Sequence, residues 1–224
     1  MVMEKLKRII KITKDGSVTI FLPEIDEHYH SIHGAIQESL HVFIKEGIDK
    51  FKNQRSINIF EVGFGTGLNA LLAADWSEQN RIIVNYTSIE PFPVEGNLLH
   101  SFIKSFKNND LEGTLKDIHQ ADWDKNVVVS DYFNLKKIKS KLLDLNLNSE
   151  GYDIVFYDAF GPRVQPDLWT IECFEKIYQL LNFNGALVTY CAKGQVKRDL
   201  KSVGFRVETC QGPPGKREMI RAWK

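Results

Sequence analysis

Residues Ile57 to Gly67 read INIFEVGFGTG, an apolar run that ends in an acidic residue and a glycine-rich turn. The E-x-G-x-G-x-G pattern within it consists of Glu61, Gly63, Gly65 and Gly67. Glycines let the backbone adopt positive φ and approach a ligand closely. The helical segment Leu68–Ala74 follows, and a helix N-terminus offers free N–H groups to a carboxylate or phosphate. The pattern therefore predicts a strand, turn and helix that bind a nucleotide-type cofactor.

Two nearby details separate the candidate cofactors. The dinucleotide fingerprint G-x-G-x-x-G/A needs a small residue three positions after its second glycine, and here that position is Leu68. The next strand-like run, Arg81–Ile89, is followed by Glu90, which can accept hydrogen bonds from both ribose hydroxyls. An acid before the loop and another after the second strand resemble S-adenosylmethionine binding in class I methyltransferases. The alternative is an ordinary strand–turn–helix that binds nothing.

Composition indicates a globular protein. The chain has 224 residues, of which 43% are hydrophobic and 26% charged, and no apolar run approaches the length of a membrane span. The start, MVMEKLKRIIKIT, lacks the continuous apolar region of a signal peptide. Cys173, Cys191 and Cys210 are widely spaced without a C-x-x-C pair. We therefore expect a cytoplasmic protein with reduced cysteines.

The order of elements predicts an α/β fold. Lys7–Leu22 reads as a hairpin turning at Asp15-Gly16, and Gly34–Phe51 has helical spacing. Strands are then expected at 57–62, 82–89, 127–130, 154–157 and 186–191. Helices are expected at 68–76, 94–106, 115–123, 167–181 and 194–203. The alternation predicts a mostly parallel sheet, of seven strands once the closing antiparallel hairpin 205–210 and 218–223 is included. We expect residues 1–52 to be an N-terminal hairpin and helix elaboration, and 53–224 to be the Rossmann-like domain.

A second group of residues follows another predicted strand. Gly151–Trp169 reads GYDIVFYDAFGPRVQPDLW, so that Asp158 ends an apolar, β-rich run. Ligands of open α/β sheets bind at this carboxyl edge. A carboxylate, the aromatic Phe160 and a loop stiffened by Pro162 and Pro166 are suited to holding a substrate amine or base. The alternative is that Asp158 merely caps a turn.

The motif D-A-F-x-P-x-x-x-P-D-L-W resembles the signature of the methyltransferase unit of the tRNA 5-methylaminomethyl-2-thiouridine biosynthesis protein (MnmC) and of its stand-alone homologues (MnmD). The segment from Tyr29 to Phe43 is similar to the family's Y-x-S-x-x-G-x-x-E-[ST]-x-x-V-F pattern. The loop FGTGLN, Glu90 with Phe92-Pro93, Lys193-Gly194 and the terminal GKREM also match. The resemblance implies a class I methyltransferase that methylates the primary amine of 5-aminomethyl-(2-thio)uridine at the tRNA wobble position.

The resemblance and the strand ends together suggest roles for individual residues. Asp158 is the expected catalytic residue, orienting the amine and accepting or relaying its proton. The expected cofactor contacts are Glu61, Gly63, Gly65, Gly67, Glu90 for the ribose diol, and Asp131 for the adenine amino group. The expected substrate side contains Glu38, Phe160 and Pro162.

Charge at the end of the chain points to a polyanion. Residues 193–224 contain nine lysines and arginines against three acidic residues, a net charge of +6 on a neutral protein. The phosphate contacts expected for a tRNA anticodon loop are Lys193, Lys197, Arg198, Lys216 and Arg217. The alternative is a solvated helix face and edge strand.

Other readings of the sequence remain open. His28, His30 and His33 form a loose H-x-H-x-x-H, but no helix enforces ligand geometry, so we expect no metal. We also expect no FAD, because the resemblance implies only the methylation step, with a separate enzyme supplying the aminomethyl-uridine. The alternatives are a methyltransferase for a small-molecule amine and a non-catalytic RNA-binding module with this fold.

Overall fold

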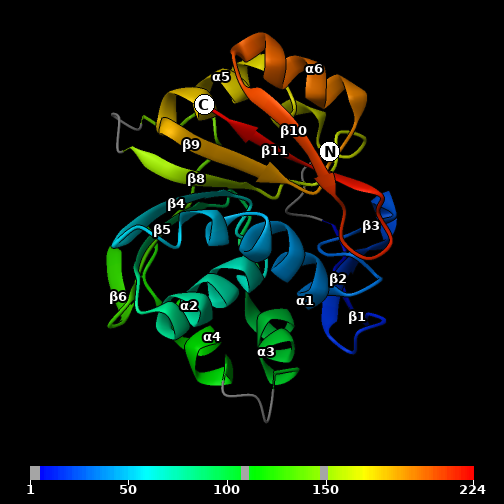
Figure 1. Cartoon of the computed structure of the whole chain (residues 1–224). Coiled ribbons are helices and arrows are strands. Elements are labelled where there is room, and N and C mark those ends of the chain that lie inside the picture. The colour runs from blue at the N-terminus through cyan, green and yellow to red at the C-terminus, as the bar shows by residue number, and fades with distance from the viewer. Residues whose placement is uncertain (1–5, 107–110, 147–150) are drawn as a thin grey trace.

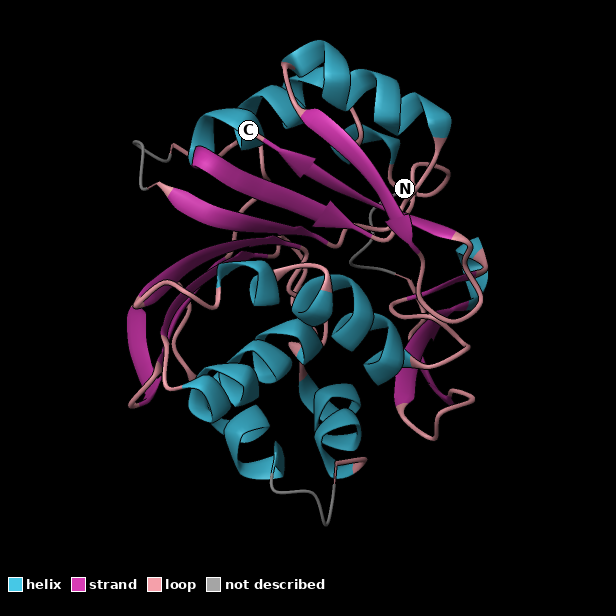
Figure 2. Cartoon of the chain, in the orientation of Figure 1, coloured by secondary structure: helices cyan, strands magenta, loops and turns pink. Residues whose placement is uncertain are grey.

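A central sheet of eight strands organises the computed structural model, which describes residues 6–106, 111–146 and 151–224 (Figures 1 and 2). The strand order across the sheet is β10-β11-β9-β8-β4-β5-β7-β6. The strand bounds are β4 Ser56–Val62, β5 Ile83–Ile89, β6 Asn126–Ser130, β7 Phe133–Ile138, β8 Tyr152–Tyr157, β9 Leu181–Thr189, β10 Arg206–Gln211 and β11 Glu218–Trp223.

Strand directions place one set of carboxyl ends at a single edge. β7, β5, β4, β8 and β9 run parallel, whereas β6, β11 and β10 join through antiparallel pairs. The expected α/β class I methyltransferase fold with an antiparallel C-terminal hairpin is therefore confirmed. The edge where Val62, Ile89 and Tyr157 end their strands carries the loops described below.

The number of strands differs from the expected seven because of β7. Phe133 and Leu135 of this strand are buried, but Asn134 and Lys136 alternate with them, so the sequence FNLKKI does not read as a core strand. β7 lies parallel beside β5, and β6, the strand expected at 127–130, is at the edge of the sheet as the antiparallel neighbour of β7.

Helices cover the sheet on both faces (Figure 2). One face packs against α1 to α4, and buried side chains such as Ile59, Tyr86 and Phe156 fill that layer. The opposite face of the β8–β9–β11 half packs against α5 and α6, with Val155 and Leu187 in the layer. The helix bounds are α1 Ala35–Ser39, α2 Leu68–Asn80, α3 Gly96–Lys104, α4 Leu111–Gln120, α5 Ile171–Leu180 and α6 Gly194–Val203.

Helix α5 begins later than the sequence suggested. The expected helix 167–181 is divided, because Pro166–Leu168 forms a single 3₁₀ turn and Thr170 then caps a new helix. The Thr170 side chain accepts a hydrogen bond from the Cys173 N–H at 3.3 Å, which satisfies one of the free N–H groups of the first turn. The other helix predictions agree within a few residues, and α6 has the expected bounds.

The N-terminal segment forms a small antiparallel sheet beside the main one (Figure 1). Its strands are β1 Ile9–Ile12, β2 Val18–Leu22 and β3 Glu27–His28, so the predicted hairpin is present and gains a third strand. Helix α1 then continues through a π-helical segment, Leu40–Lys45, and a 3₁₀ turn at Ile48–Phe51. This segment packs on the main sheet, where the ring centroids of Phe43 and Phe156 are 5.1 Å apart.

Candidate active site

The loop after β4 passes against the end of β8. Gly63, Gly65 and Gly67 all have positive φ, between +52° and +95°. A Cβ atom on Gly63 would lie 2.7 Å from the carbonyl oxygen of Asp158, so no larger residue fits there. The loop then enters α2, whose first turn contains Asn69. The glycine pattern thus places a helix N-terminus and a bare backbone at the carboxyl edge of the sheet.

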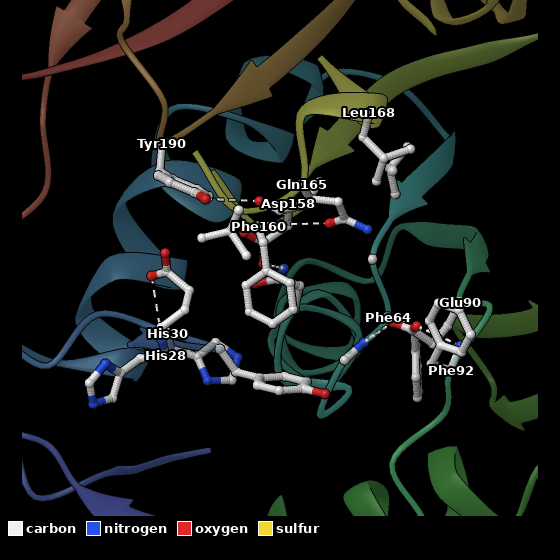
Figure 3. Close-up of a pocket in the computed structure, with 18 of the residues that line it drawn as sticks. His28, His30, Phe64, Glu90, Phe92, Asp158, Phe160, Gln165, Leu168 and Tyr190 are labelled. Carbon is white, nitrogen blue, oxygen red and sulfur yellow. Dashed lines mark hydrogen bonds between the residues drawn. The ribbon is translucent and has the colours of Figure 1, made fainter. Parts of the chain in front are cut away.

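A cavity of about 950 Å³ opens at this edge (Figure 3). Segments far apart in the chain line it: β3 and the residues before α1, the glycine loop, and the segments that follow β5, β8 and β9. Its volume is at the upper end of the range for small-molecule sites, which is room enough for a nucleoside cofactor and part of a second substrate.

Glu90 lies on one side of the glycine loop. Its Oε2 accepts a hydrogen bond from the Gly65 N–H at 3.1 Å and its Oε1 accepts one from the Phe92 N–H at 2.9 Å. Burial raises the pKa of this carboxyl. Each oxygen keeps a second lone pair, so the carboxyl is oriented by the backbone and remains able to accept bonds from a ligand diol.

Asp158 and Glu61 share one amide on the other side of the loop. Asn69 Nδ2 donates to Asp158 Oδ2 at 2.8 Å and to Glu61 Oε1 at 3.0 Å. Ser88 Oγ donates to the second oxygen of Glu61 at 2.5 Å. Burial raises the pKa of Asp158 to about 7 and that of Glu61 further, to about 8. The more deeply buried Glu61 therefore holds a proton more strongly, and Asp158 is the carboxyl able to exchange a proton near neutral pH.

Next to Asp158, a group of aromatic and charged side chains forms one part of the cavity, called the lobe below. It consists of Tyr29, Glu38, Phe160, Tyr190 and Lys216. The Phe160 and Tyr29 rings meet edge to face at 5.1 Å. Tyr190 donates its hydroxyl to the Ala159 carbonyl at 2.8 Å, which holds the ring beside the cavity. Glu38, from α1, accepts the Ser31 N–H at 2.9 Å on one oxygen and contacts Lys216 Nζ at 2.5 Å on the other. The lobe combines aromatic faces with fixed carboxylates, a set suited to a base carrying an amine.

Hydrogen bonds from α4 and β7 also hold the glycine loop, through residues that the sequence patterns did not indicate. His119 Nε2 donates to the Thr66 carbonyl at 2.9 Å, and Lys137 Nζ donates to the His119 carbonyl at 2.9 Å. Burial lowers the pKa of Lys137 to about 8. Because these residues come from α4 and β7, their relation to the loop depends on tertiary packing.

Several of the expected site residues come together in the cavity. Gly63, Gly65, Glu90, Asp158, Phe160, Glu38 and Lys216 line it, and Glu61 joins through Asn69. Pro162 is outside the lining, in the turn that follows Phe160. The sequence analysis assigned no role to Asn69, although its place at the start of α2, directly after the glycine loop, was a usable signal.

Asp131 was wrongly placed by the sequence. It lies on the exposed turn between β6 and β7, and β7 starts beside the start of β5, where Phe133 pairs with Val84. Asp131 is therefore at the amino edge of the sheet, opposite the cavity, and cannot contact an adenine bound there. The reason is that β6 and β7 form an antiparallel hairpin, so the end of β6 is at the wrong edge.

The expected phosphate contacts divide into two groups. Lys193, Arg198 and Arg217 are exposed, at the start of α6 and in the C-terminal hairpin. Lys197 pairs with Glu218 at 2.7 Å, and Lys216 pairs with Glu38 in the cavity. Lys216 therefore faces the cavity lobe, in contrast to the exposed Arg217 beside it.

Two further observations concern the residues that the structure describes. No group of three or more His, Cys, Asp or Glu side chains among them has a metal-binding arrangement. None of the described helices combines the length and apolar character needed to cross a membrane.

Known proteins share this sequence and fold. A family model described as S-adenosyl-L-methionine-dependent methyltransferase matches residues 99–224. The bifunctional protein MnmC of Campylobacter hominis, named for tRNA 5-methylaminomethyl-2-thiouridine biosynthesis, is 29% identical over 91% of this chain and 31% of its own. The protein of the same name from Cupriavidus necator is 31% identical over 90% of this chain and 32% of its own. The chain thus spans about a third of the length of these curated relatives.

Solved structures give the same picture. The crystal structure of MNMC2 from Aquifex aeolicus matches 98% of this chain and 71% of its own, with a TM-score of 0.73 and 26% identity. Spermidine synthase from Thermotoga maritima, at 13% identity and a TM-score of 0.59, shares the fold alone. The resemblance to the methyltransferase unit of MnmC that the motifs indicated is confirmed. Since the matched residues 99–224 are more than half of the chain, the protein belongs to the S-adenosyl-L-methionine-dependent methyltransferase family.

Proposed function

We propose that this protein transfers a methyl group to the primary amine of 5-aminomethyl-(2-thio)uridine at the wobble position of tRNA. The observation that carries the proposal is Asp158, a carboxyl with a pKa raised to about 7 that faces an aromatic lobe next to the glycine loop. The names of the MnmC relatives and of the Aquifex structure support the same reaction.

The cavity residues fit S-adenosylmethionine. Gly63 and Gly65 have no side chain, so S-adenosylmethionine could approach the protein backbone closely at these positions. Glu90 is positioned to accept hydrogen bonds from the ribose hydroxyls. When bound, the cofactor supplies a methyl group on a positively charged sulfur, so that transfer forms a carbon–nitrogen bond, breaks the carbon–sulfur bond and leaves one proton to be removed. We assign no residue to the adenine amino group, because Asp131 lies at the opposite edge.

Asp158 is the group that takes this proton. The amine attacks through its lone pair, so it must lose a proton before or during attack. Asn69 holds the Asp158 carboxyl in one orientation by a 2.8 Å hydrogen bond, and Glu61, with the higher pKa, stays neutral beside it. A fixed, ionised Asp158 therefore both orients the amine and accepts its proton.

The aromatic lobe would take the target base. Recognition of a single base in an RNA loop usually involves turning it out of the stack onto aromatic side chains. Phe160 and Tyr29 provide such surfaces at the cavity, next to the Asp158 carboxyl. The exposed Lys193, Arg198 and Arg217 are the candidates for the flanking phosphates. A separate enzyme would supply the aminomethyl group, because the resemblance to the methyltransferase unit of MnmC implies only the methylation step.

The test is methyl transfer to RNA that lacks the modification. Purified protein is incubated with labelled S-adenosylmethionine and tRNA from cells without this methylation, and the nucleosides are then separated. We expect aminomethyl-uridine to become methylaminomethyl-uridine, with kcat/KM reduced by about 10²-fold or more in Asp158→Asn. Binding of S-adenosylhomocysteine by calorimetry is the folding control for the variant.

Two results would contradict the proposal. Methylation of a small amine without RNA would favour the small-molecule alternative. Cofactor binding with no methyl transfer to any hypomodified tRNA would favour a non-catalytic RNA-binding role.

A further inference from the structure

Lys216 lines the cavity next to Glu38 and Tyr190, on the side proposed to hold the acceptor amine, although it belongs to the basic C-terminal hairpin. Its ammonium lies 2.5 Å from Glu38 Oε1 and 4.0 Å from the centroid of the Tyr190 ring. The loop between β10 and β11 reaches down to α1 in Figure 1, and His41 Nε2 holds it by a 2.8 Å hydrogen bond to the Gln211 carbonyl. The Lys216 side chain is 34% exposed and lies between a carboxylate and an aromatic face.

The Glu38 carboxylate is held in place by a backbone hydrogen bond, and it holds the Lys216 ammonium in turn. Its second oxygen accepts the Ser31 N–H at 2.9 Å, so one oxygen is bound to the backbone and the other to Lys216. The Glu38 side chain is only 11% exposed. The two opposite charges therefore largely offset each other, and the fixed ammonium of Lys216 is the positive end of the pair beside the part of the cavity that Asp158 faces.

Other charged and titratable groups bear on the same space. In the cavity lining they include Arg8, Glu27, His30, Glu90, Asp158 and Tyr190, and beside the lining they include His33, Glu61, Tyr86 and Cys191. Among the charges acting on Asp158, Glu38 raises the pKa of the carboxyl and Lys216 lowers it. At Asp158, Lys216 is thus a positive charge that opposes the effect of Glu38.

We propose that Lys216 is a positioning residue for the reaction, whose ammonium offsets the Glu38 carboxylate and so favours loss of a proton from the acceptor amine, and that it is not a contact to RNA phosphate. The inference rests on the proposed function, because it needs an amine as the acceptor. A fixed cation a few ångströms away disfavours the protonated form of an amine, as a neighbouring positive charge does for activated lysines. Glu38 and Tyr190 hold the cation without removing its charge.

The proton balance is simple. The amine arrives as an ammonium and gives one proton to Asp158, while Lys216 keeps its own proton throughout. Because Lys216 disfavours protonation of both the amine and Asp158, each is deprotonated at a lower pH than it would be without this charge. Removal of the Lys216 charge should therefore move the pH dependence of methyl transfer to higher pH.

The matched comparison is between Lys216 and its exposed neighbour Arg217. For Lys216→Gln we expect the acidic limb of kcat/KM toward hypomodified tRNA to move up by about one pH unit, with the salt dependence unchanged. Lys216→Arg, which retains the charge, should keep the wild-type midpoint. Arg217→Gln should keep the midpoint as well, but its log–log salt slope should become shallower by about one. Lys216→Met repeats the test if the Gln variant binds S-adenosylhomocysteine poorly.

A shallower salt slope in Lys216→Gln with an unmoved pH midpoint would show a phosphate contact and overturn the inference. A second measurement needs no acceptor: ¹³C NMR titration of the Asp158 side-chain carboxyl, identified by its absence in Asp158→Asn. The Asp158 midpoint should rise in Lys216→Gln and stay in Lys216→Arg; no change in either would also overturn the inference. If the wild-type protein methylates no tRNA, the proposed function fails, and this titration still decides whether Lys216 controls the charge of the site.

Discussion

The Asp158 carboxyl combines burial with a single strong hydrogen bond, and this has a consequence for stability. In the folded protein its pKa rises from the ordinary 3.8 to about 7, so the folded state binds the proton more tightly than the unfolded chain. Between these two values the protein therefore loses stability as pH rises, because the unfolded state releases the proton first. The buried Asp158 carboxyl thus lowers the stability of the fold at neutral pH.

Asp158→Asn should accordingly stabilise the protein more at high pH than at low pH. The amide retains the size of the side chain and removes the ionisation, so the gain in Tm over wild type should be larger at pH 8 than at pH 4.5. Thermal unfolding followed by circular dichroism measures it. Asp131→Asn, on the exposed turn at the opposite edge of the sheet, makes the same chemical change outside the cavity. A gain in Tm that is equal at both pH values would contradict the assignment of a raised pKa.

At the scale of elements, β4, the glycine loop and α2 form the unit that builds the site. The loop fits because Gly63 adopts a φ of +95° and passes against the backbone that ends β8. The Gly63 and Phe64 N–H groups both donate to the Ile89 carbonyl, at 3.1 and 3.2 Å, which ties the same loop to β5. The loop therefore joins three strand ends, and its conformation determines where Glu90 and Asp158 lie relative to each other.

Gly63→Ala should disturb this unit more than the same change at another glycine with positive φ. Gly16 has a φ of +82° but open space around the position of a Cβ atom, so Gly16→Ala costs only the backbone strain, about 1–3 kcal/mol. At Gly63 the added Cβ also meets the Asp158 carbonyl at 2.7 Å. We expect a larger loss of unfolding free energy in urea, together with weaker S-adenosylhomocysteine binding that Gly16→Ala does not show. Equal effects of the two changes would mean that the loop does not press against β8.

At the scale of the whole molecule, the cavity is assembled from segments spread over most of the chain. Arg8, before β1, donates to the carbonyls of Phe92 and Pro93 at 3.3 and 3.4 Å, and Arg163 donates to Glu27 at 3.1 Å. The small N-terminal sheet is thus tied to the rims of the cavity on two sides. We propose that residues 1–52 act as part of the substrate site, since Tyr29 and Glu38 contribute to its lobe.

Although the net charge is zero, the positive side chains are unevenly distributed, and the salt dependence of tRNA binding should show which of them contact RNA. Arg198 and Arg217 are exposed on α6 and in the C-terminal hairpin, whereas Lys52 and Arg55 are exposed before β4, at the amino edge of the sheet. Converting Arg198 and Arg217 together to Gln should reduce the log–log salt slope of tRNA binding by about two. The Lys52 and Arg55 double change to Gln removes the same charge at the far edge and should leave the slope unchanged. Equal slopes in both doubles would contradict an RNA surface at the hairpin.

Local sequence was sufficient to predict the parts of the site that directly follow a strand. The glycine loop, Glu90 and Asp158 each follow an apolar strand within a few residues, and in a parallel sheet all such ends meet at one edge. For the same reason the fold class followed from the alternation of strands and helices. The misassigned strand shows the limit: β7 alternates buried and polar residues, so it lacks the continuous apolar run of a central strand, and Asp131 was assigned to the wrong edge with it.

The sequence by itself thus determined the fold class and placed the glycine loop and Asp158 at the carboxyl edge of the sheet, because backbone conformation and strand ends are local properties. Tertiary structure alone decided which charges act on that carboxyl. Asn69, which also bonds Glu61, reaches Asp158 across 89 positions of chain, and Lys216 reaches Glu38 across 178. Neither contact has a signature in sequence spacing, because it depends on how α2 and the C-terminal hairpin pack against the sheet. Burial then sets the protonation of each group, which residue type does not specify.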